Sequence, residues 1–265
     1  MSPTDIDWNA AAYHRVSGAQ IAWGLEVLDR LRLSGDETVL DVGCGPGNLT
    51  KVLAERLPRG RVFALDNSPD MLARAARELA SFGPRVQLIR AQLPDLPLPG
   101  PVHAIVSTAT LHWVLDHPAL FRAFRQALLP GGQLEFQCGG VGNLHRFYAQ
   151  AFDLAATPEY RDAFRGWADP WRFVGPEETR ERLLAAGFVE VKTWLENKPT
   201  RYPDSAAYTD FIGHVILRPL VARLEPDRAR RFTLALAESA GRQEPPYVLE
   251  YVRLNASART PGERG

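Results

Sequence analysis

The sequence predicts an α/β protein with a Rossmann-like doubly wound, mostly parallel seven-stranded sheet. Apolar runs of strand length alternate with helical patterns as far as residue 140, which is typical of parallel strands joined by right-handed crossovers. A glycine-rich turn at 43–47 joins the first run to its helix. After residue 142 the alternation ends. This change predicts a helical cap inserted between strands five and six, with further helices before the last strand.

The first half of the chain is expected to supply an N-terminal helix and five strands. Residues 8–33 carry Ile21, Leu25, Leu28 and Leu31 at helical spacing, so we expect this helix to lie over an edge of the sheet. Each expected strand is a short run rich in apolar residues. The five runs are 38–42, 61–65, 86–89, 104–106 and 133–138.

Helix signals separate these runs. The helix after the first strand should end at Pro58. A Ser-Pro pair at 68–69 predicts the start of the next helix, with the serine as its cap and the proline in its first turn. A further helix is expected over 118–129, followed by a Pro-Gly-Gly turn at 130–132.

Residues 141–256 are expected to form the cap and the C-terminal elements. The expected elements are an aromatic-rich helix after Gly142, a helix over 176–186, a strand over 189–195, a helical stretch over 205–240 and a last strand over 247–255. The tail 257–265 is polar and glycine-containing, so it is expected to be disordered. The length favours a single domain over 1–256, with its core at 34–140.

Composition excludes several classes of function. The 265 residues are 45% hydrophobic and carry no formal net charge, and no basic block stands out. These features argue against a nucleic acid or a membrane as the main partner and favour a small-molecule substrate. The two cysteines, Cys44 and Cys138, are too few for a thiolate metal site, so no metal is expected. The absence of an apolar leader or span predicts a cytoplasmic protein, and the oligomeric state is left open.

The turn at 43–47 is the most informative stretch. Gly43, Gly45 and Gly47 follow an apolar strand and precede an amphipathic helix, so their backbone can approach a ligand more closely than any Cβ would allow. A dinucleotide fingerprint places its third glycine one position later, where this chain has Asn48. Asp41 can orient the loop or meet a ligand's ammonium group. The alternative is a tight turn without a ligand.

Other candidates follow the remaining strands, where ligands bind in open α/β sheets. Asp66 ends the second strand and can accept both hydroxyls of a ribose, although NAD would use the same carboxylate. Gln92 follows the third strand, and its amide can both accept and donate hydrogen bonds. His112 follows the fourth strand and is a candidate general base or a wall of the site. Each of these side chains could instead be an ordinary surface or packing residue.

These motifs resemble the class I S-adenosylmethionine-dependent methyltransferases, most closely the small-molecule branch that includes trans-aconitate and juvenile hormone acid methyltransferases. The resemblance rests on the opening with Trp8 and Tyr13, the segment 40–47, the segment 66–71 and the Leu-His-Trp triplet at 111–113. It covers residues 8–140 well and is thinner beyond. In this family an acid often stands where this chain has Gln92, so the adenine contact departs from the pattern.

The resemblance implies S-adenosyl-L-methionine as the cofactor and an in-line transfer of its methyl group to a small molecule. The implied cofactor-binding residues are Tyr13, Gln20, Asp41, Gly43, Cys44, Gly45, Gly47, Asp66, Asn67, Met71, Gln92, Leu93 and Thr108. His112 is the one candidate catalytic residue. The expected reaction is O-methylation of a carboxylate or hydroxyl. A carboxylate acceptor needs no base, whereas a phenol or an amine often does, and His112 has no convincing second catalytic partner in the sequence, which favours a carboxylate. Arg146, Arg172 or Arg218 could hold a second anionic group or form surface ion pairs.

Two alternatives stay open at this stage. A nicotinamide-dependent oxidoreductase would use the same fold, although the glycine spacing is against it. A non-catalytic module that binds the cofactor or a partner could also share the fold.

Overall fold

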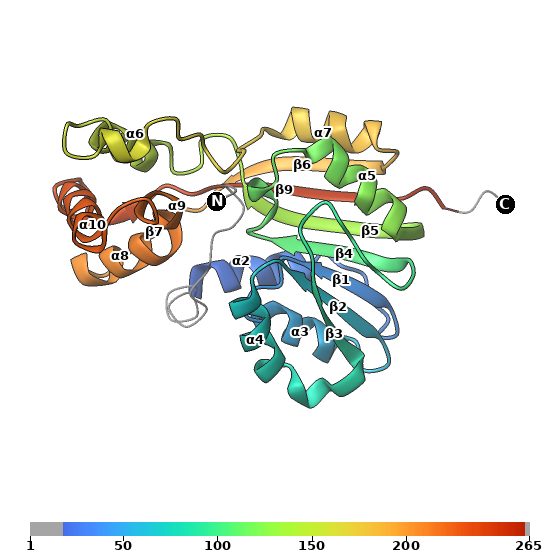
Figure 1. Ribbon diagram of the computed structural model, residues 1–265. Helices are drawn as coiled ribbons and strands as arrows, with labels where there is room; N and C mark the ends of the chain where they lie inside the picture. The colour runs from blue at the N-terminus through green and yellow to red at the C-terminus, as the bar shows by residue number, and fades with distance from the viewer. Residues whose placement is uncertain (1–17, 263–265) are drawn as a thin grey trace.

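The computed structural model describes residues 18–262, and its centre is a seven-stranded sheet (Figure 1). The strand order is β3-β2-β1-β4-β5-β9-β6. All neighbouring strands run parallel except at β9, which is antiparallel to both β5 and β6. The strands are β1 (Thr38–Val42), β2 (Arg61–Asp66), β3 (Val86–Arg90), β4 (Val102–Thr108), β5 (Leu128–Gly139), β6 (Val189–Asn197) and β9 (Val252–Arg259). The predicted fold class is confirmed.

Helices cover both faces of this sheet because alternate strand residues point to opposite sides. In β1, Val39 packs in one apolar cluster, whereas Leu40 and Val42 pack in another. The face of the sheet that carries Val39 is covered by α2 (Gly18–Leu28) and α3 (Asn48–Arg56), and α4 (Pro69–Glu78) contacts α3. The second cluster is covered by α5 (His117–Ala127) and α7 (Pro176–Ala185).

The helix starts follow the local sequence signals. Ser68 caps α4, since its Oγ accepts a hydrogen bond from the Met71 N–H at 3.3 Å, and a proline occupies the first turn. Asp116 caps α5 in the same way, accepting from the Ala119 N–H at 2.9 Å. Short 3-10 turns lie at η1 (Ala80–Arg85) and η2 (Leu111–Trp113). The cap predicted at Ser68 is therefore confirmed, and the Asp116 cap is a finding of the structure.

The cap stands beyond the end of the sheet at which β5 finishes (Figure 1). Its elements are α6 (His145–Ala155), η3 (Arg161–Phe164), β7 (Thr200–Arg201), α8 (Ser205–Phe211), the π-helical turn η4 (Ile212–Ile216), α9 (Arg218–Val221), α10 (Pro226–Gly241) and β8 (Val248–Leu249). These elements share an apolar cluster of their own. The stretch predicted to be helical over 205–240 consists of several helices, because Pro219 and Pro226 each lie in the first turn of a new helix.

The predicted disordered tail is also wrong in its first residues. β9 continues to Arg259, so Ser257 lies within the strand and contacts the Glu135 carboxylate. Thr260 is 1% exposed, and its Oγ1 accepts from the Gly132 N–H at 2.8 Å. The polar composition of this stretch led to the prediction of a disordered tail. Because β9 lies between two strands, residues of the neighbouring strands form hydrogen bonds with these polar side chains. The last strand predicted over 247–255 is two elements, β8 and β9.

Two other expectations need correction. The helix expected over an edge of the sheet, α2, contacts the central strands β4 and β5 instead. β5 begins at Leu128, and the expected turn at 130–132 is an irregularity inside its pairing with β4. Residues 1–17, which include Trp8 and Tyr13, lie outside the described residues.

Candidate active site

A cavity of about 230 Å³ lies at the carboxyl ends of the parallel strands, between the sheet and the cap. Asp66 and Thr108, which end β2 and β4, and His112 of η2 line one part of it, and Tyr148 of α6 lines it from the cap. This is the edge at which open α/β sheets bind ligands. Most of the predicted site residues within 18–262 meet here, namely Gln20, Gly43, Cys44, Gly45, Asp66, Asn67, Met71, Gln92, Leu93, Thr108 and His112.

The glycine-rich turn keeps the cavity open at one end. Gly45 has φ +54°, and a Cβ built on it would meet no protein atom within 4 Å. Gly43 has φ +74°, but its Cβ would lie 2.0 Å from Thr110 Oγ1. Gly43 is thus required for packing within the protein, whereas Gly45 leaves room beside the backbone for a ligand.

Asp41 lies behind this turn and is not among the residues that line the cavity. Its side chain is 4% exposed and accepts a hydrogen bond from Thr50 Oγ1 at 2.7 Å. Burial raises the pKa of Asp41 to about 6, although the Thr50 hydrogen bond opposes the shift. Two roles were predicted for Asp41, which are orienting the loop and contacting a ligand's ammonium group. The buried position of its carboxyl fits the first role. Gly47 also lies outside the cavity lining, at the N-cap of α3.

Asp66 connects the glycine turn to the end of β2. Its two carboxylate oxygens accept from the backbone N–H groups of Gly45 and Ser68, each at 2.9 Å. Burial raises the pKa of Asp66 above its ordinary value, and these backbone donors oppose the shift. The carboxylate is therefore held in one orientation at the rim of the space beside Gly45.

Gln92 follows β3 and meets Asn67, whose Nδ2 donates to Gln92 Oε1 at 3.0 Å. Both side chains line the cavity, as does Met71, which is 4% exposed. The amide of Gln92 keeps its Nε2 donors and a second lone pair on Oε1. An amide in this place can meet a heteroaromatic edge that presents both a donor and an acceptor.

His112 lies in η2, directly after β4. The backbone N–H of Gly139 donates to His112 Nδ1 at 3.3 Å. Burial and the nearby Arg253 guanidinium hold the pKa of His112 well below its usual value, so the ring is neutral near pH 7. Because Nδ1 accepts a hydrogen bond, the proton of the neutral ring is on Nε2.

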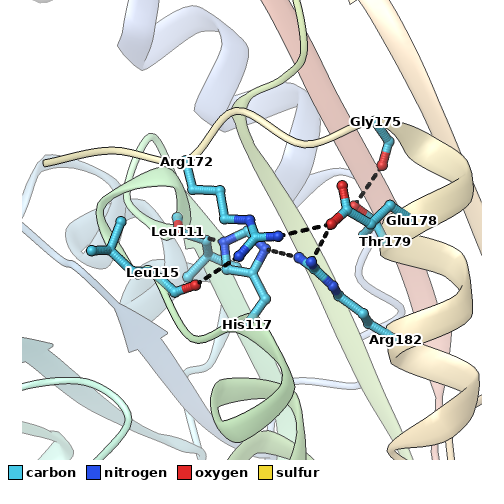
Figure 2. A network of polar contacts seen from close by, with 8 residues as sticks. All are labelled: Leu111, Leu115, His117, Arg172, Gly175, Glu178, Thr179 and Arg182. Atoms are coloured by element: carbon cyan, nitrogen blue, oxygen red, sulfur yellow. Dashed lines mark hydrogen bonds and ion pairs between the residues drawn. The ribbon is translucent and has the colours of Figure 1, made fainter. Parts of the chain in front are cut away.

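A polar network behind η2 holds this segment in place (Figure 2). His117 is 2% exposed, and its Nε2 lies 3.1 Å from the carbonyl oxygen of Leu111. Its Nδ1 lies 3.3 Å from Nη1 of Arg182. A carbonyl can only accept and a guanidinium can only donate, so His117 is the neutral tautomer with its proton on Nε2.

Arg172 ties the same segment to α7 (Figure 2). Its backbone N–H donates to the His112 carbonyl oxygen at 2.7 Å, and its Nη1 donates to the Leu115 carbonyl oxygen at 3.4 Å. Glu178 Oε1 accepts from Arg172 Nη2 at 3.0 Å and also contacts Arg182. Hydrogen bonds to the carbonyl oxygens of Leu111 and His112 therefore fix the backbone that carries the His112 ring.

Aromatic rings form the cap side of the cavity. Tyr148 stacks on Trp171 with ring centroids 4.6 Å apart, and Phe173 lies 5.7 Å from the His112 ring. Trp113 meets Trp171 edge to face at 5.9 Å. Burial raises the pKa of Tyr148 above its usual value, so its phenol stays neutral. Their apolar faces disfavour water in this half of the cavity.

Arg253 at the start of β9 also lines the cavity, and the sequence reading missed it. The residue is 3% exposed, and its Nε donates to Gln137 Oε1 at 3.5 Å. Its sequence signal was the alternation of Arg253, Asn255 and Ser257, which marks one polar face of a strand. That signal was missed because the strand was expected to end at Asn255.

The arginines that the sequence offered as anion-binding residues lie elsewhere. Arg146 forms an exposed ion pair with Glu250 at 3.0 Å, and Arg172 pairs with Glu178 as described. Neither of these residues, nor Arg218, is among the described residues that line the cavity. The other role expected for these arginines was ion pairing at the surface, and Arg146 and Arg172 both form such pairs.

The cysteines carry no disulfide. Cys44 and Cys138 are both free and buried, and burial raises the pKa of each thiol. Within residues 18–262 no three His, Cys, Asp or Glu side chains gather closely enough to hold a metal ion. None of the helices in that range is both long and apolar enough to cross a lipid bilayer.

The cavity lining fits an S-adenosyl nucleoside. The space beside Gly45 would admit the ligand backbone, the carboxylate of Asp66 would accept two ribose hydroxyls, and Gln92 would meet the adenine edge. Gln20 and Thr108 line the same space. Tyr13, also expected to contact the cofactor, lies outside the described residues.

Comparison with known proteins agrees with this fit. Residues 39–132 match the family model described as a methyltransferase domain. A trans-aconitate 2-methyltransferase from Methylobacterium nodulans is 35% identical over 241 residues, which are 88% of this chain and 90% of that protein. A second from Methylobacterium radiotolerans is 30% identical over 259 residues, or 91% of each chain.

Solved structures share the fold. The phosphoethanolamine N-methyltransferase 2 of Haemonchus contortus in complex with S-adenosyl-L-methionine superposes with a TM-score of 0.61 at 18% identity. The match covers 95% of this chain and 56% of that chain. The curated relatives favour methyl transfer over both alternatives considered from the sequence, the oxidoreductase and the non-catalytic module. The chain therefore belongs to the class I S-adenosylmethionine-dependent small-molecule methyltransferases, in the branch that contains the trans-aconitate 2-methyltransferases.

Proposed function

We propose that this enzyme methylates a carboxylate oxygen of a small organic acid. The observation that carries the proposal is the state of His112. Its Nδ1 accepts from Gly139 and its pKa lies well below the usual value, so Nε2 carries the proton and offers a hydrogen-bond donor. Such a donor can bind a methyl acceptor that is already an anion. It cannot remove the proton from a methyl acceptor that must be deprotonated before it reacts.

The two halves of the cavity have different tasks. Gly45, Asp66 and Gln92 would hold the nucleoside, as argued from their geometry. When bound, S-adenosyl-L-methionine supplies a methyl group on a positively charged sulfur; as an acceptor oxygen bonds to that carbon, the carbon–sulfur electron pair returns to sulfur and neutral S-adenosylhomocysteine leaves. The residues of the chain have to align the acceptor and exclude water, and such positioning can contribute about 7–11 kcal/mol.

A carboxylate fits these conditions because it is ionised near neutral pH, with an ordinary pKa of about 4. The neutral His112 ring would orient one of its oxygens, and the aromatic rings around Trp171 would keep water away. The names of the curated relatives point to the same chemistry, since they are trans-aconitate 2-methyltransferases.

Transfer of a labelled methyl group to a panel of organic acids tests the proposal. We expect label in a product that mild alkali releases as methanol, as an ester requires, and one S-adenosylhomocysteine for each methyl transferred. Phenols and amines of similar size are the comparison acceptors. Label found only in phenols or amines would overturn the proposal.

The role of His112 is tested separately by substitution. His112→Gln keeps a nitrogen donor near the place of Nε2 and should retain much of kcat/KM, whereas His112→Phe should lose roughly 10-fold or more. Binding of S-adenosylhomocysteine, measured by calorimetry, serves as the control for folding. If His112→Gln is as inactive as His112→Phe and the activity rises with a pKa of the histidine, the ring acts as a base and a carboxylate acceptor is no longer favoured.

A further inference from the structure

We propose that the side-chain amide of Asn143 donates a hydrogen bond to one oxygen of the acceptor carboxylate while His112 Nε2 donates to the other. The pair thereby selects a methyl acceptor that presents two adjacent oxygens. This inference rests on the proposed function and adds to it a second residue that contacts the acceptor. Asn143 was not predicted from the sequence. It lies in the turn between β5 and α6, lines the cavity and is 5% exposed.

The orientation of the Asn143 amide follows from its neighbour on β9. The backbone N–H of Val252 donates to Asn143 Oδ1 at 3.1 Å. Only the oxygen of an amide can accept from an N–H, so this contact distinguishes Oδ1 from Nδ2. The turn itself is tied to the same strand, because the Gly140 N–H donates to the Val252 carbonyl oxygen and the Asn143 N–H donates to the Gly140 carbonyl oxygen, each at 3.0 Å. The amide therefore presents its two N–H groups away from Val252.

Nδ2 of Asn143 is the end of the amide that a ligand can reach. Within residues 18–262 it has no hydrogen-bond acceptor, yet it is not one of the fully buried polar atoms that lack a partner. Because the residue is almost fully buried and lines the cavity, the small accessible surface of Nδ2 faces that cavity. A donor in such a place favours a ligand that brings an oxygen to it, since an unmet donor costs free energy.

Gly139 brings Asn143 and His112 together at the end of β5. Its N–H donates to His112 Nδ1 at 3.3 Å, and a Cβ built on Gly139 would lie 3.0 Å from Asn143 Nδ2 and 2.6 Å from Phe173 Cε1. A side chain at this position would therefore displace both the amide and the aromatic ring. With glycine there, the two N–H donors lie beside the same residue, within reach of the two oxygens of one carboxylate.

A carboxylate is the acceptor that satisfies both donors. A phenol or an alcohol has a single oxygen and would leave one donor unmet, and a neutral amine has one lone pair and adds donors of its own. Because Asn143 is an amide and His112 is neutral near pH 7, the two donors orient the carboxylate without the charge withdrawal of an ion pair. After methyl transfer, the carbonyl oxygen of the ester can still accept from one of them.

Asn143→Asp is the substitution that tests the donor, because it keeps an oxygen for Val252 and replaces Nδ2 with a second oxygen. At pH 8 the ionised side chain would repel the acceptor carboxylate. We therefore expect kcat/KM for the acid that the wild type methylates fastest to fall by roughly 30- to 100-fold. The affinity for S-adenosylhomocysteine, measured by calorimetry, should be unchanged. Asn197→Asp, at an exposed amide on β6, is the matched control and should retain the wild-type kcat/KM.

A pH series separates a donor from a purely structural contact. As the pH falls, the new carboxyl of Asn143→Asp takes up a proton and becomes a donor, with an ordinary pKa of about 4 that burial raises. The ratio of its kcat/KM to that of the wild type should therefore rise at least about 10-fold between pH 8 and pH 5. The titrations of His112, His117 and the acceptor occur in both proteins, and the neighbouring Arg253 stays protonated, so the ratio reports the new carboxyl.

The inference is overturned if Asn143→Asp keeps the wild-type kcat/KM at pH 8, or if its ratio to the wild type does not change with pH. If Asn143→Asp does not fold, as judged by S-adenosylhomocysteine calorimetry, Asn143→Ser decides. A loss of about 10-fold in kcat/KM with unchanged affinity for S-adenosylhomocysteine then supports the donor, and a wild-type value overturns it.

Failure of the proposed function gives a different result, because the wild type would then methylate no acid. In that case trans-aconitate and benzoate are titrated by calorimetry into the complexes of wild type and Asn143→Asp with S-adenosylhomocysteine at pH 8. Tighter binding of either acid to the wild type supports the contact with Asn143, whereas equal binding, or no binding to the wild type, overturns it.

Discussion

Gly43 and Gly45 stand two residues apart in one turn, yet a side chain would meet different surroundings at each. A Cβ at Gly43 would clash with Thr110, while a Cβ at Gly45 would point into open cavity space. Both residues have positive φ, so alanine at either carries a backbone cost of about 1 kcal/mol. Comparison of Gly43→Ala with Gly45→Ala therefore separates the effect of packing within the protein from the effect on ligand binding.

We predict that Gly45→Ala lowers the affinity for S-adenosylhomocysteine at least about 10-fold and reduces stability by only about 1–2 kcal/mol. Gly43→Ala should reduce stability by about 3 kcal/mol or more, because Thr110 must move. Calorimetry and urea unfolding measure the two effects. Equal affinity of Gly45→Ala and wild type would remove Gly45 from the cofactor site.

The carboxyl of Asp41 makes stability depend on pH. Its pKa is about 6 in the folded protein, against an ordinary value of 3.8, so the folded state binds the proton more tightly. The protonated form is therefore the stabilising one. Its contribution is complete below about pH 4 and is lost as the pH rises to about 6 and beyond.

Asp41→Asn removes this titration while keeping an oxygen for Thr50. We expect the variant to exceed the wild type in unfolding free energy at pH 8 by up to about 3 kcal/mol, and to match it near pH 4. Urea unfolding at the two pH values, without ligand, measures the difference. A variant that is less stable than wild type at pH 8 would contradict the argument.

At the scale of elements, the network of Figure 2 joins η2, α5 and α7 through His117. Burial and the neighbouring Arg182 and Arg172 lower the pKa of His117, while the Leu111 carbonyl and Glu178 oppose the shift. The neutral ring is the stabilising form. Its contribution is complete above the unfolded pKa of about 6.5 and is lost as the pH falls through the lower pKa of the folded state.

His117→Gln should therefore cost about 1–3 kcal/mol at pH 7.5, because buried partners lose their hydrogen bonds. The cost should shrink at pH 5, where the wild type has also lost stability. The matched control is His214→Gln, at an exposed histidine beside Asp210, which should cost little at either pH. A cost that stays constant or grows at pH 5 would show that His117 is not held neutral.

For the whole molecule, the last strand connects the sheet to the active site. β9 lies between β5 and β6, so its residues pair on both sides, and its first residues carry Arg253 to the cavity. Ala256 and Ala258 are buried at its far end, and Thr260, directly after the strand, is buried as well. The fold and the acceptor side of the site therefore depend on the same segment.

A chain that ends after Asn255 should lose more than about 4 kcal/mol of unfolding free energy or fail to fold, since the pairing of 256–259 with both neighbours is removed. A chain that ends after Gly262 is the control and should melt like the full chain. Thermal unfolding distinguishes the two. Similar melting of both truncated chains would mean that this part of β9 adds little.

The cofactor half of the site could be predicted from local signals. The glycine turn and Asp66 each follow a strand that the apolar pattern identified, and parallel strands bring their carboxyl ends to one edge. The acceptor half could not be predicted in the same way. Arg253 lies more than a hundred residues after Gln137 and Tyr148, and no spacing rule relates it to them.

The fold class, the family and the residues beside the glycine turn could be predicted from local patterns, because each depends on neighbours in the chain. The burial of Asp41 behind the turn, the hydrogen bond from Gly139 to His112 and the place of Arg253 at the cavity became known from the three-dimensional fold. The place of Arg253 depends on the antiparallel insertion of β9 beside β5. Strand pairing over more than a hundred residues leaves no local trace in the sequence, whereas a turn or a helix cap does.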